Sequence, residues 1–165
     1  MAYTNVSNKA PVGVIGAGSF GTAVANLLAE NSRVILYSRS PEKVEEINRT
    51  KVSSGQQLHH HITVTNDIES FCQECYLIFP SVPSSNFRSM LRDFAPFLRP
   101  DHMLVHTTKG LDVNLNSTEN IFDKNISFET SEIQTMSQLI IQETNVKRVG
   151  CMSGPNLAKE IAQLQ

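Results

Sequence analysis

The sequence predicts an α/β fold built on a doubly wound, mostly parallel sheet in a single domain. Short apolar runs recur along the chain, and amphipathic or alanine-rich stretches separate most of them. This alternation is typical of parallel sheets, because neighbouring parallel strands need a crossover connection, usually a helix. The predicted strands are at residues 12–15, 33–38, 62–65, 76–79, 103–106 and 146–152.

The composition agrees with a compact domain and excludes several classes of protein. The chain has 165 residues, of which 40% are hydrophobic and 18% charged, enough to build a real core. A net charge of −2 with scattered basic residues predicts no nucleic-acid partner. No apolar run approaches the length of a membrane helix, and the N-terminus lacks the apolar core of a signal peptide. We therefore expect a cytoplasmic protein with no membrane partner.

The first strand leads into a glycine-rich turn and then a helix. The turn has the spacing G-x-G-x-x-G, and the helix is expected over residues 22–30. Gly16 allows a tight turn, Gly18 lets a pyrophosphate approach the backbone, and Gly21 lets the helix pack on the strand. The phosphates would meet free N–H groups at the helix N-terminus. A plain glycine-rich turn is the alternative, but the flanking strand and helix favour a dinucleotide site.

The end of the second strand predicts which dinucleotide binds. About 20 positions beyond the first glycine, an acidic residue holds the ribose 2′-hydroxyl of NAD, whereas a basic residue accepts the 2′-phosphate of NADP. Here Arg39 lies between Ser38 and Ser40, with no carboxylate at the strand end. A guanidinium flanked by hydroxyls suits a phosphate monoester and can stack on adenine, so NADP is slightly favoured over NAD. An exposed arginine without a ligand is the alternative.

A short helix and a polar loop follow the second strand. Ser40 as the cap and Pro41 in the first turn predict a helix over residues 41–49. Residues 50–61 are polar and predict a loop that ends in three consecutive histidines. Because no second ligand cluster has a matching spacing, we expect no metal site there.

Two cysteines lie in the next predicted helix. Asp67 caps this helix, which is expected over residues 68–75. Cys72 and Cys75 form a C-x-x-C pair on one helical face, where we expect ordinary half-buried thiols. A metal or redox role is the alternative.

Two later strands carry polar loops to the edge of the sheet that holds the glycine turn. Residues 80–85, with two prolines, follow the fourth strand and precede a helix expected over residues 86–98. The fifth strand is followed by Lys109 and a glycine. Ligands of open parallel sheets bind at the carboxyl ends of strands, so Lys109 is well placed to meet a phosphorylated or carbonyl substrate. A solvated surface lysine is the alternative.

The last third of the chain departs from this repeat. Residues 112–130 are rich in Asn and Ser and predict an excursion outside the sheet, for which a hairpin is one possibility. An N-capped helix with one apolar face is expected over residues 131–145. After the last strand, a helix begins at residue 157 and is cut off at residue 165, as expected of an excised domain.

Four stretches occur together in an order known from one family. They read GAGSFGTA at residues 16–23, VPS at 82–84, TKGL at 108–111 and SGPNLAKEIA at 153–162. Together they resemble the N-terminal, cofactor-binding domain of the soluble, bacterial-type NAD(P)-dependent glycerol-3-phosphate dehydrogenases. The resemblance implies a Rossmann-type fold over residues 1–165 and the reversible reduction of dihydroxyacetone phosphate to sn-glycerol 3-phosphate, which feeds glycerophospholipid synthesis.

The resemblance also implies residue roles. The implied cofactor contacts are Gly16, Gly18, Ser19, Phe20, Gly21, Arg39, Pro83, Lys109 and Ala158. Lys109 would touch the substrate as well as the cofactor, with Gly154 and Asn156 on the substrate side. The small-molecule partners would be dihydroxyacetone phosphate and sn-glycerol 3-phosphate, and the full-length enzyme could be a homodimer.

The resemblance covers only the first half of such an enzyme. In the family, the proton-donating lysine and most substrate-phosphate ligands belong to a C-terminal all-α domain, which has no counterpart here. We therefore expect the chain alone to be inactive or nearly so. Two alternatives stay open: another two-domain NAD(P) dehydrogenase, acting on a 3-hydroxy acid or 6-phosphogluconate, and a non-catalytic NADPH-binding module.

Overall fold

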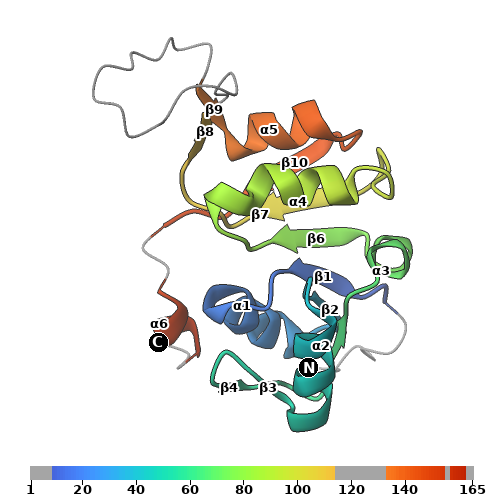
Figure 1. Ribbon diagram of the computed structural model, residues 1–165, viewed down its shortest axis with the longest axis vertical. Helices are drawn as coiled ribbons and strands as arrows, with labels where there is room; N and C mark the ends of the chain where they lie inside the picture. The colour runs from blue at the N-terminus through green and yellow to red at the C-terminus, as the bar shows by residue number, and fades with distance from the viewer. Residues whose placement is uncertain (1–8, 114–132, 155–156, 163–165) are drawn as a thin grey trace, which may run out of the picture.

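The centre of the molecule is a six-stranded sheet in which every pair of neighbouring strands is parallel (Figure 1). The computed structural model describes residues 9–113, 133–154 and 157–162. The strands are β1 (Val12–Ile15), β2 (Val34–Tyr37), β5 (Ile62–Thr65), β6 (Leu77–Pro80), β7 (Met103–His106) and β10 (Arg148–Cys151). Their spatial order is β10-β7-β6-β1-β2-β5, so the chain winds outward from the β1–β6 pair in both directions. The predicted doubly wound sheet is confirmed, and its order is that of the Rossmann fold.

Helices cover both faces of this sheet. They are α1 (Ser19–Ala29), α2 (Pro41–Thr50), α3 (Ile68–Glu74), α4 (Phe87–Phe94), α5 (Met136–Glu143) and α6 (Ala158–Ala162). A 3₁₀ turn, Ser84–Asn86, precedes α4. The helices α1 and α2 pack on one face, α3, α4 and α5 pack on the other, and α6 packs against α1.

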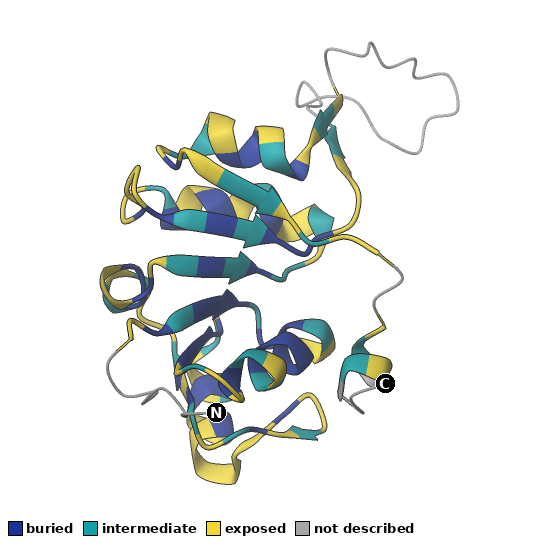
Figure 2. Ribbon diagram, turned by 180° about the vertical axis from the view of Figure 1, so that it is seen from behind, coloured by how far each residue is buried: buried dark blue, intermediate teal, exposed yellow. Residues whose placement is uncertain are grey.

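The central strands β1, β2 and β6 contribute to two hydrophobic cores because successive side chains point to opposite faces. Val14 packs with α1 and α2, whereas its neighbour Ile15 packs with α3, α4 and α5. In the same way Leu36 belongs to the first core and Ile35 to the second. Figure 2 shows the buried residues gathered along the central strands and on the sheet-facing sides of the helices.

Two predicted helix caps are present. The Ser40 hydroxyl accepts the backbone N–H of Lys43 at 3.1 Å, and Pro41 occupies the first turn of α2. The Asp67 carboxylate accepts the backbone N–H of Ser70 at 3.1 Å and so caps α3. These caps satisfy donors that a helix start otherwise leaves without a partner.

The helix expected over residues 131–145 begins later than predicted. α5 starts at Met136, and its cap is Thr135, which forms a capping box with Gln138. The three residues before the helix form β9 (Ile133–Thr135), which pairs antiparallel with β8 (Leu111–Val113). β8 and β9 thus pair on either side of residues 114–132, which lie outside the described part of the chain, and the hairpin predicted within residues 112–130 stays a prediction.

The loop expected over residues 50–61 contains a small hairpin. Its strands, β3 (Val52–Ser53) and β4 (Gln56–Gln57), are antiparallel. The turn between them consists of Ser54 and Gly55, both with positive φ, at 47° and 77°. A two-residue turn of this kind matches the twist of paired strands, so the backbone closes a ladder despite its polar side chains.

Other boundaries also differ from the prediction, most of all those of α1 and α4. α1 begins at Ser19 inside the glycine motif rather than after it, and α4 ends at Phe94 instead of continuing to residue 98. None of the helices in the described part of the chain is long and apolar enough to cross a bilayer.

Candidate functional site

The glycine turn lies where the chain reverses its winding direction. β1 and β6 are neighbours in the sheet, but the helices that follow them pack on opposite faces: α1 after β1 on one face, and α4 after β6 on the other. The backbone N–H of Ser81, just after β6, donates to the Ile15 carbonyl at 2.8 Å. The two loops therefore flank a crevice at the carboxyl edge of the sheet, which is the general ligand position in open α/β sheets.

The three glycines of the turn have different surroundings. Gly16 has a φ of +114°, and a Cβ there would lie 2.7 Å from the Ser81 carbonyl oxygen. A Cβ on Gly21 would lie 1.9 Å from the Gly16 carbonyl oxygen, so the helix could not approach the turn. A Cβ on Gly18 would meet no atom within 4 Å. The turn is thus closed beneath Gly16 and Gly21 and open above Gly18.

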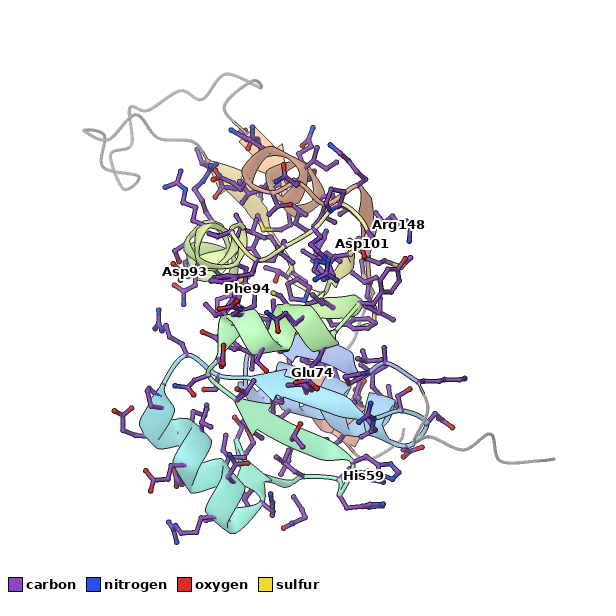
Figure 3. The ribbon with its side chains drawn as sticks, turned by 90° about the vertical axis from the view of Figure 1, so that its right-hand side faces the viewer. His59, Glu74, Asp93, Phe94, Asp101 and Arg148 are labelled. Carbon is purple, nitrogen blue, oxygen red and sulfur yellow. The ribbon has the colours of Figure 1, made fainter. Side chains whose placement is uncertain are left out.

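One cleft extends from the turn toward the end of β2. It has a volume of about 300 Å³ and is lined by residues 15–18, the end of β2 and part of α4. Tyr37 and Phe94 lie on its apolar side, with ring centroids 4.9 Å apart in an edge-on arrangement. Arg39 and Lys43 place two cations at this cleft, and Asp93 contributes a carboxylate. Asp93 and Phe94 are both labelled in Figure 3.

A second cleft extends from the turn toward β7. It has a volume of about 380 Å³ and shares Gly18, Val82 and Pro83 with the first cleft. Lys109 lines it, together with the first residues of α1 and the loop after β6. The Thr108 hydroxyl donates to the Val82 carbonyl at 2.7 Å, which ties the loop that carries Lys109 to the neighbouring loop. The two clefts therefore meet at the glycine turn.

The structure brings most of the predicted site residues together. Those that line the two clefts are Gly16, Gly18, Ser19, Phe20, Arg39, Pro83 and Lys109. Gly154 follows β10, the parallel neighbour of β7, and so lies beyond the same edge of the sheet. Ala158 is the first residue of α6, which packs against α1, and neither it nor Gly154 is among the lining residues of these two clefts. Asn156 lies outside the described residues.

Sequence reasoning missed Lys43. This residue is in the first turn of α2, and its ammonium group donates to the Ala17 carbonyl at 2.7 Å. The sequence did contain a signal for it: Lys43 is four positions after Arg39, in the first turn of the helix that begins just after the end of β2. The contact with Ala17 itself depends on how α2 packs beside the glycine turn.

The two cysteines of the C-x-x-C pair are fully buried rather than half-buried. Cys72 and Cys75 are each 1% exposed and pack in the core formed by α3, α4 and α5. Burial raises the pKa of each thiol to about 12. The thiolate form is therefore strongly disfavoured, and the prediction of structural thiols fits this environment.

The three histidines form a turn before β5, as predicted. His59, labelled in Figure 3, lies at the edge where the strands begin, opposite the glycine turn. One ring nitrogen from each of His59, His60 and His61 lies within 4.8 Å of the other two. However, Nδ1 of His59 accepts the His61 backbone N–H at 3.2 Å, which places the proton of the neutral ring on the other nitrogen. This ring is not poised to bind an ion, and the absence of a metal site stays a prediction.

The fold and its two clefts define the class: a Rossmann-type nucleotide-binding domain. The chain belongs to the NAD-dependent glycerol-3-phosphate dehydrogenase family and matches its N-terminal region over residues 11–165.

Among curated relatives, the chain is 37% identical to a glycerol-3-phosphate dehydrogenase [NAD(P)+] of Saccharophagus degradans, over 99% of this chain and 42% of that protein. It is 38% identical to the Ectopseudomonas mendocina protein of the same name, over 92% of this chain and 41% of that protein. The chain thus spans about two fifths of the length of these relatives. A crystal structure of glycerol-3-phosphate dehydrogenase from Coxiella burnetii is similar with a TM-score of 0.75 at 23% identity, covering 94% of this chain and 44% of that one.

Proposed function

We propose that this chain is the cofactor-binding half of a glycerol-3-phosphate dehydrogenase and that it binds NADPH or NADH across the two clefts, with NADPH preferred. The observation that carries the proposal is the G-x-G-x-x-G turn at the point where the winding reverses, with Gly18 shared by both clefts. Membership of the family supplies the reaction: hydride transfer between the nicotinamide and dihydroxyacetone phosphate or sn-glycerol 3-phosphate.

The clefts fit a dinucleotide in size and chemistry. Ligand pockets commonly measure roughly 300–1,000 Å³, and two adjoining clefts suit a ligand with two nucleoside halves. The open space above Gly18 leaves room for a pyrophosphate, and the first turn of α1 offers N–H groups without intrahelical partners. In this arrangement Arg39 meets the adenosine end, while Phe20 and Pro83 lie along the second cleft.

Lys109 is the chain's own contribution to the chemistry. The bound nicotinamide supplies or accepts the hydride. When a hydride reaches the substrate carbonyl, negative charge develops on its oxygen, and the ammonium group of Lys109 stabilises that charge. By the resemblance, Gly154 and Asn156 contact the substrate, and Gly154 follows β10. The proton that completes the alcohol comes from the C-terminal half of the full-length enzyme, and losing a general acid lowers the rate by about 10² to 10⁴.

Calorimetric titration of the chain with NADPH and NADH tests the cofactor assignment. We expect NADPH to bind more tightly and Arg39→Ala to remove that preference. A charge-assisted hydrogen bond is worth about 1.5–3 kcal/mol, so NADPH should lose roughly 10-fold to 100-fold in affinity while NADH changes little. Arg49→Ala, on the exposed last turn of α2, is the matched control. Failure of both nucleotides to bind the unmodified chain would refute the proposal.

Oxidation of NADPH by dihydroxyacetone phosphate tests the reaction. A full-length protein that contains this chain should turn over, and the chain by itself should show little or no activity. Lys109→Met in the full-length protein should lower kcat. Tight binding of NADPH without any turnover by the full-length protein would favour a non-catalytic module instead.

A further inference from the structure

The carbonyl oxygen of Ala17, inside the glycine turn, accepts an unusual number of hydrogen bonds. The donors are Lys43 Nζ at 2.7 Å, Ser54 Oγ at 3.1 Å and Ser53 Oγ at 3.4 Å. They are 26, 37 and 36 residues away in the sequence, on α2 and on the β3–β4 hairpin. A carbonyl oxygen has two lone pairs, so these three donors saturate it. We call Lys43, Ser53 and Ser54 the Ala17 clamp.

The β3–β4 hairpin also contacts the residues that follow Ala17. The Gln56 side-chain amide donates to the Ser19 carbonyl at 3.0 Å. The hydroxyls of Ser53 and Thr22 are hydrogen-bonded at 2.9 Å. Ser53 and Thr22 are both buried, so water does not compete for this contact. The hairpin therefore supports the turn and the start of α1 at three successive points.

Holding the Ala17 carbonyl also orients the next amide. The peptide between Ala17 and Gly18 is planar and trans, so its N–H points away from its C=O. With the carbonyl directed at the clamp, the Gly18 N–H faces the other way, and no hydrogen bond within the described residues uses it. Gly18 lines both clefts, and the space above it is open.

We propose that the Ala17 clamp is a positioning device for the phosphate-binding turn, in which Lys43 and Ser54 act through the Ala17–Gly18 peptide and raise affinity for the pyrophosphate that NADH and NADPH share. The proposal rests on the cofactor site proposed above. It assigns Lys43 a role different from that of Arg39, although both line the first cleft. Arg39 meets a group that only NADPH carries, whereas the clamp serves a group that both nucleotides carry.

Titrations of three variants with both nucleotides separate these roles. Lys43→Met removes the charged donor while keeping much of the side-chain volume, and we expect roughly tenfold weaker binding of NADH and NADPH alike. Ser54→Ala should weaken both by about threefold, since a neutral hydrogen bond contributes less. Lys43→Arg keeps a donor at this position and should restore most of the affinity. Lys147→Met, an exposed lysine before β10, is the matched control and should change neither affinity.

The ratio of the NADPH affinity to the NADH affinity of each variant shows whether the Ala17 clamp acts on the shared pyrophosphate. A loss confined to NADPH would show that Lys43 contacts the 2′-phosphate directly and would overturn the clamp. Unchanged affinities for both nucleotides would overturn it as well. Thermal unfolding of each variant without nucleotide shows whether the chain remains folded at the titration temperature, so a loss of binding is not confused with unfolding.

A nucleotide-independent measurement keeps this test separate from the proposed function. If the unmodified chain binds neither nucleotide, the proposed function fails, and the clamp is judged by the Ala17 carbonyl ¹³C resonance. That resonance should move in Lys43→Met and in Ser54→Ala because the carbonyl loses a donor in each. An unchanged resonance in both variants would refute the clamp.

Discussion

Replacing Gly21 by alanine should destabilise the fold through a single clash. The added Cβ would lie 1.9 Å from the Gly16 carbonyl oxygen, which is backbone and cannot rotate away. Overpacking a well-packed site usually costs about 1–3 kcal/mol, and a clash between two backbone segments belongs at the upper end. In a chain of this size each kcal/mol lowers Tm by roughly 2–4 °C, so a cost of about 3 kcal/mol gives a Tm lower by roughly 6–12 °C.

Gly18→Ala provides the matched control, because it adds the same methyl group three residues earlier. Gly18 has a φ of −84° and a ψ of 179°, which alanine adopts readily, and its Cβ would meet no atom within 4 Å. We expect its Tm to change little, since exposed substitutions typically alter stability by about 0.5 kcal/mol or less. Its methyl group would occupy the space proposed for the pyrophosphate, so binding of NADH and NADPH should weaken by roughly tenfold or more.

Thermal unfolding followed by circular dichroism, together with nucleotide titration, measures both effects. The reasoning predicts opposite patterns: Gly21→Ala loses stability, and Gly18→Ala loses binding while staying stable. A Tm for Gly21→Ala within about 2 °C of the unmodified chain would refute the packing argument, because that is the shift expected from less than 1 kcal/mol. A stable Gly18→Ala variant with unchanged affinity would refute the placement of the pyrophosphate.

Three further predictions concern groups outside the clefts. Burial lowers the pKa of His102 and of His106 from the ordinary 6.5, so protonation favours the unfolded chain. The free energy of unfolding, measured with urea, should therefore be highest above about pH 6.5 and fall as the pH decreases below it. A free energy of unfolding that does not change with pH in this range would contradict the lowered pKa values. Arg88→Met removes the ion pairs that join α4 to carboxylates on β8 and at the end of α5. We expect it to lower the free energy of unfolding by about 2 kcal/mol, less than the roughly 3–5 kcal/mol lost when a fully buried pair is broken. The Arg92 side chain is 63% exposed, so Arg92→Met should lower the free energy of unfolding much less. A thiol reagent should modify exposed Cys151 in the folded chain and the two buried cysteines only after unfolding, and rapid reaction of all three would contradict their burial.

Local chemistry explains why much of the fold could be predicted. The Ser40 and Asp67 caps need only a side chain and an N–H three residues later, and both are present. The continuous apolar run of β2 is buried throughout, as expected of a strand covered on both faces. The steric demand on Gly21 also follows from the spacing, because the Gly16 carbonyl oxygen that it approaches belongs to the same strand, turn and helix. The close approach of Ser81 to Gly16, by contrast, joins segments that are distant in the chain.

The errors arose where distant segments compete with local patterns. The helix predicted from residue 131 begins at Met136, because residues 133–135 pair with β8 and because the capping box at Thr135 is a strong start. Residues 50–61 are polar and predict a loop, but contacts of their hairpin with Ala17 and Thr22 hold it beside the glycine turn. Neither pairing has a periodic pattern of its own.

The sequence by itself determined the alternation of strands and helices, the glycine turn and the basic residue at the end of β2, since each depends on residues that are close in the chain. Only the tertiary structure decided that the two clefts meet at Gly18 and that Lys43 and Ser54 hold the Ala17 carbonyl. These contacts join residues 26 and 37 positions apart. Their geometry depends on how α2 and the β3–β4 hairpin pack against the start of α1, which no local pattern encodes.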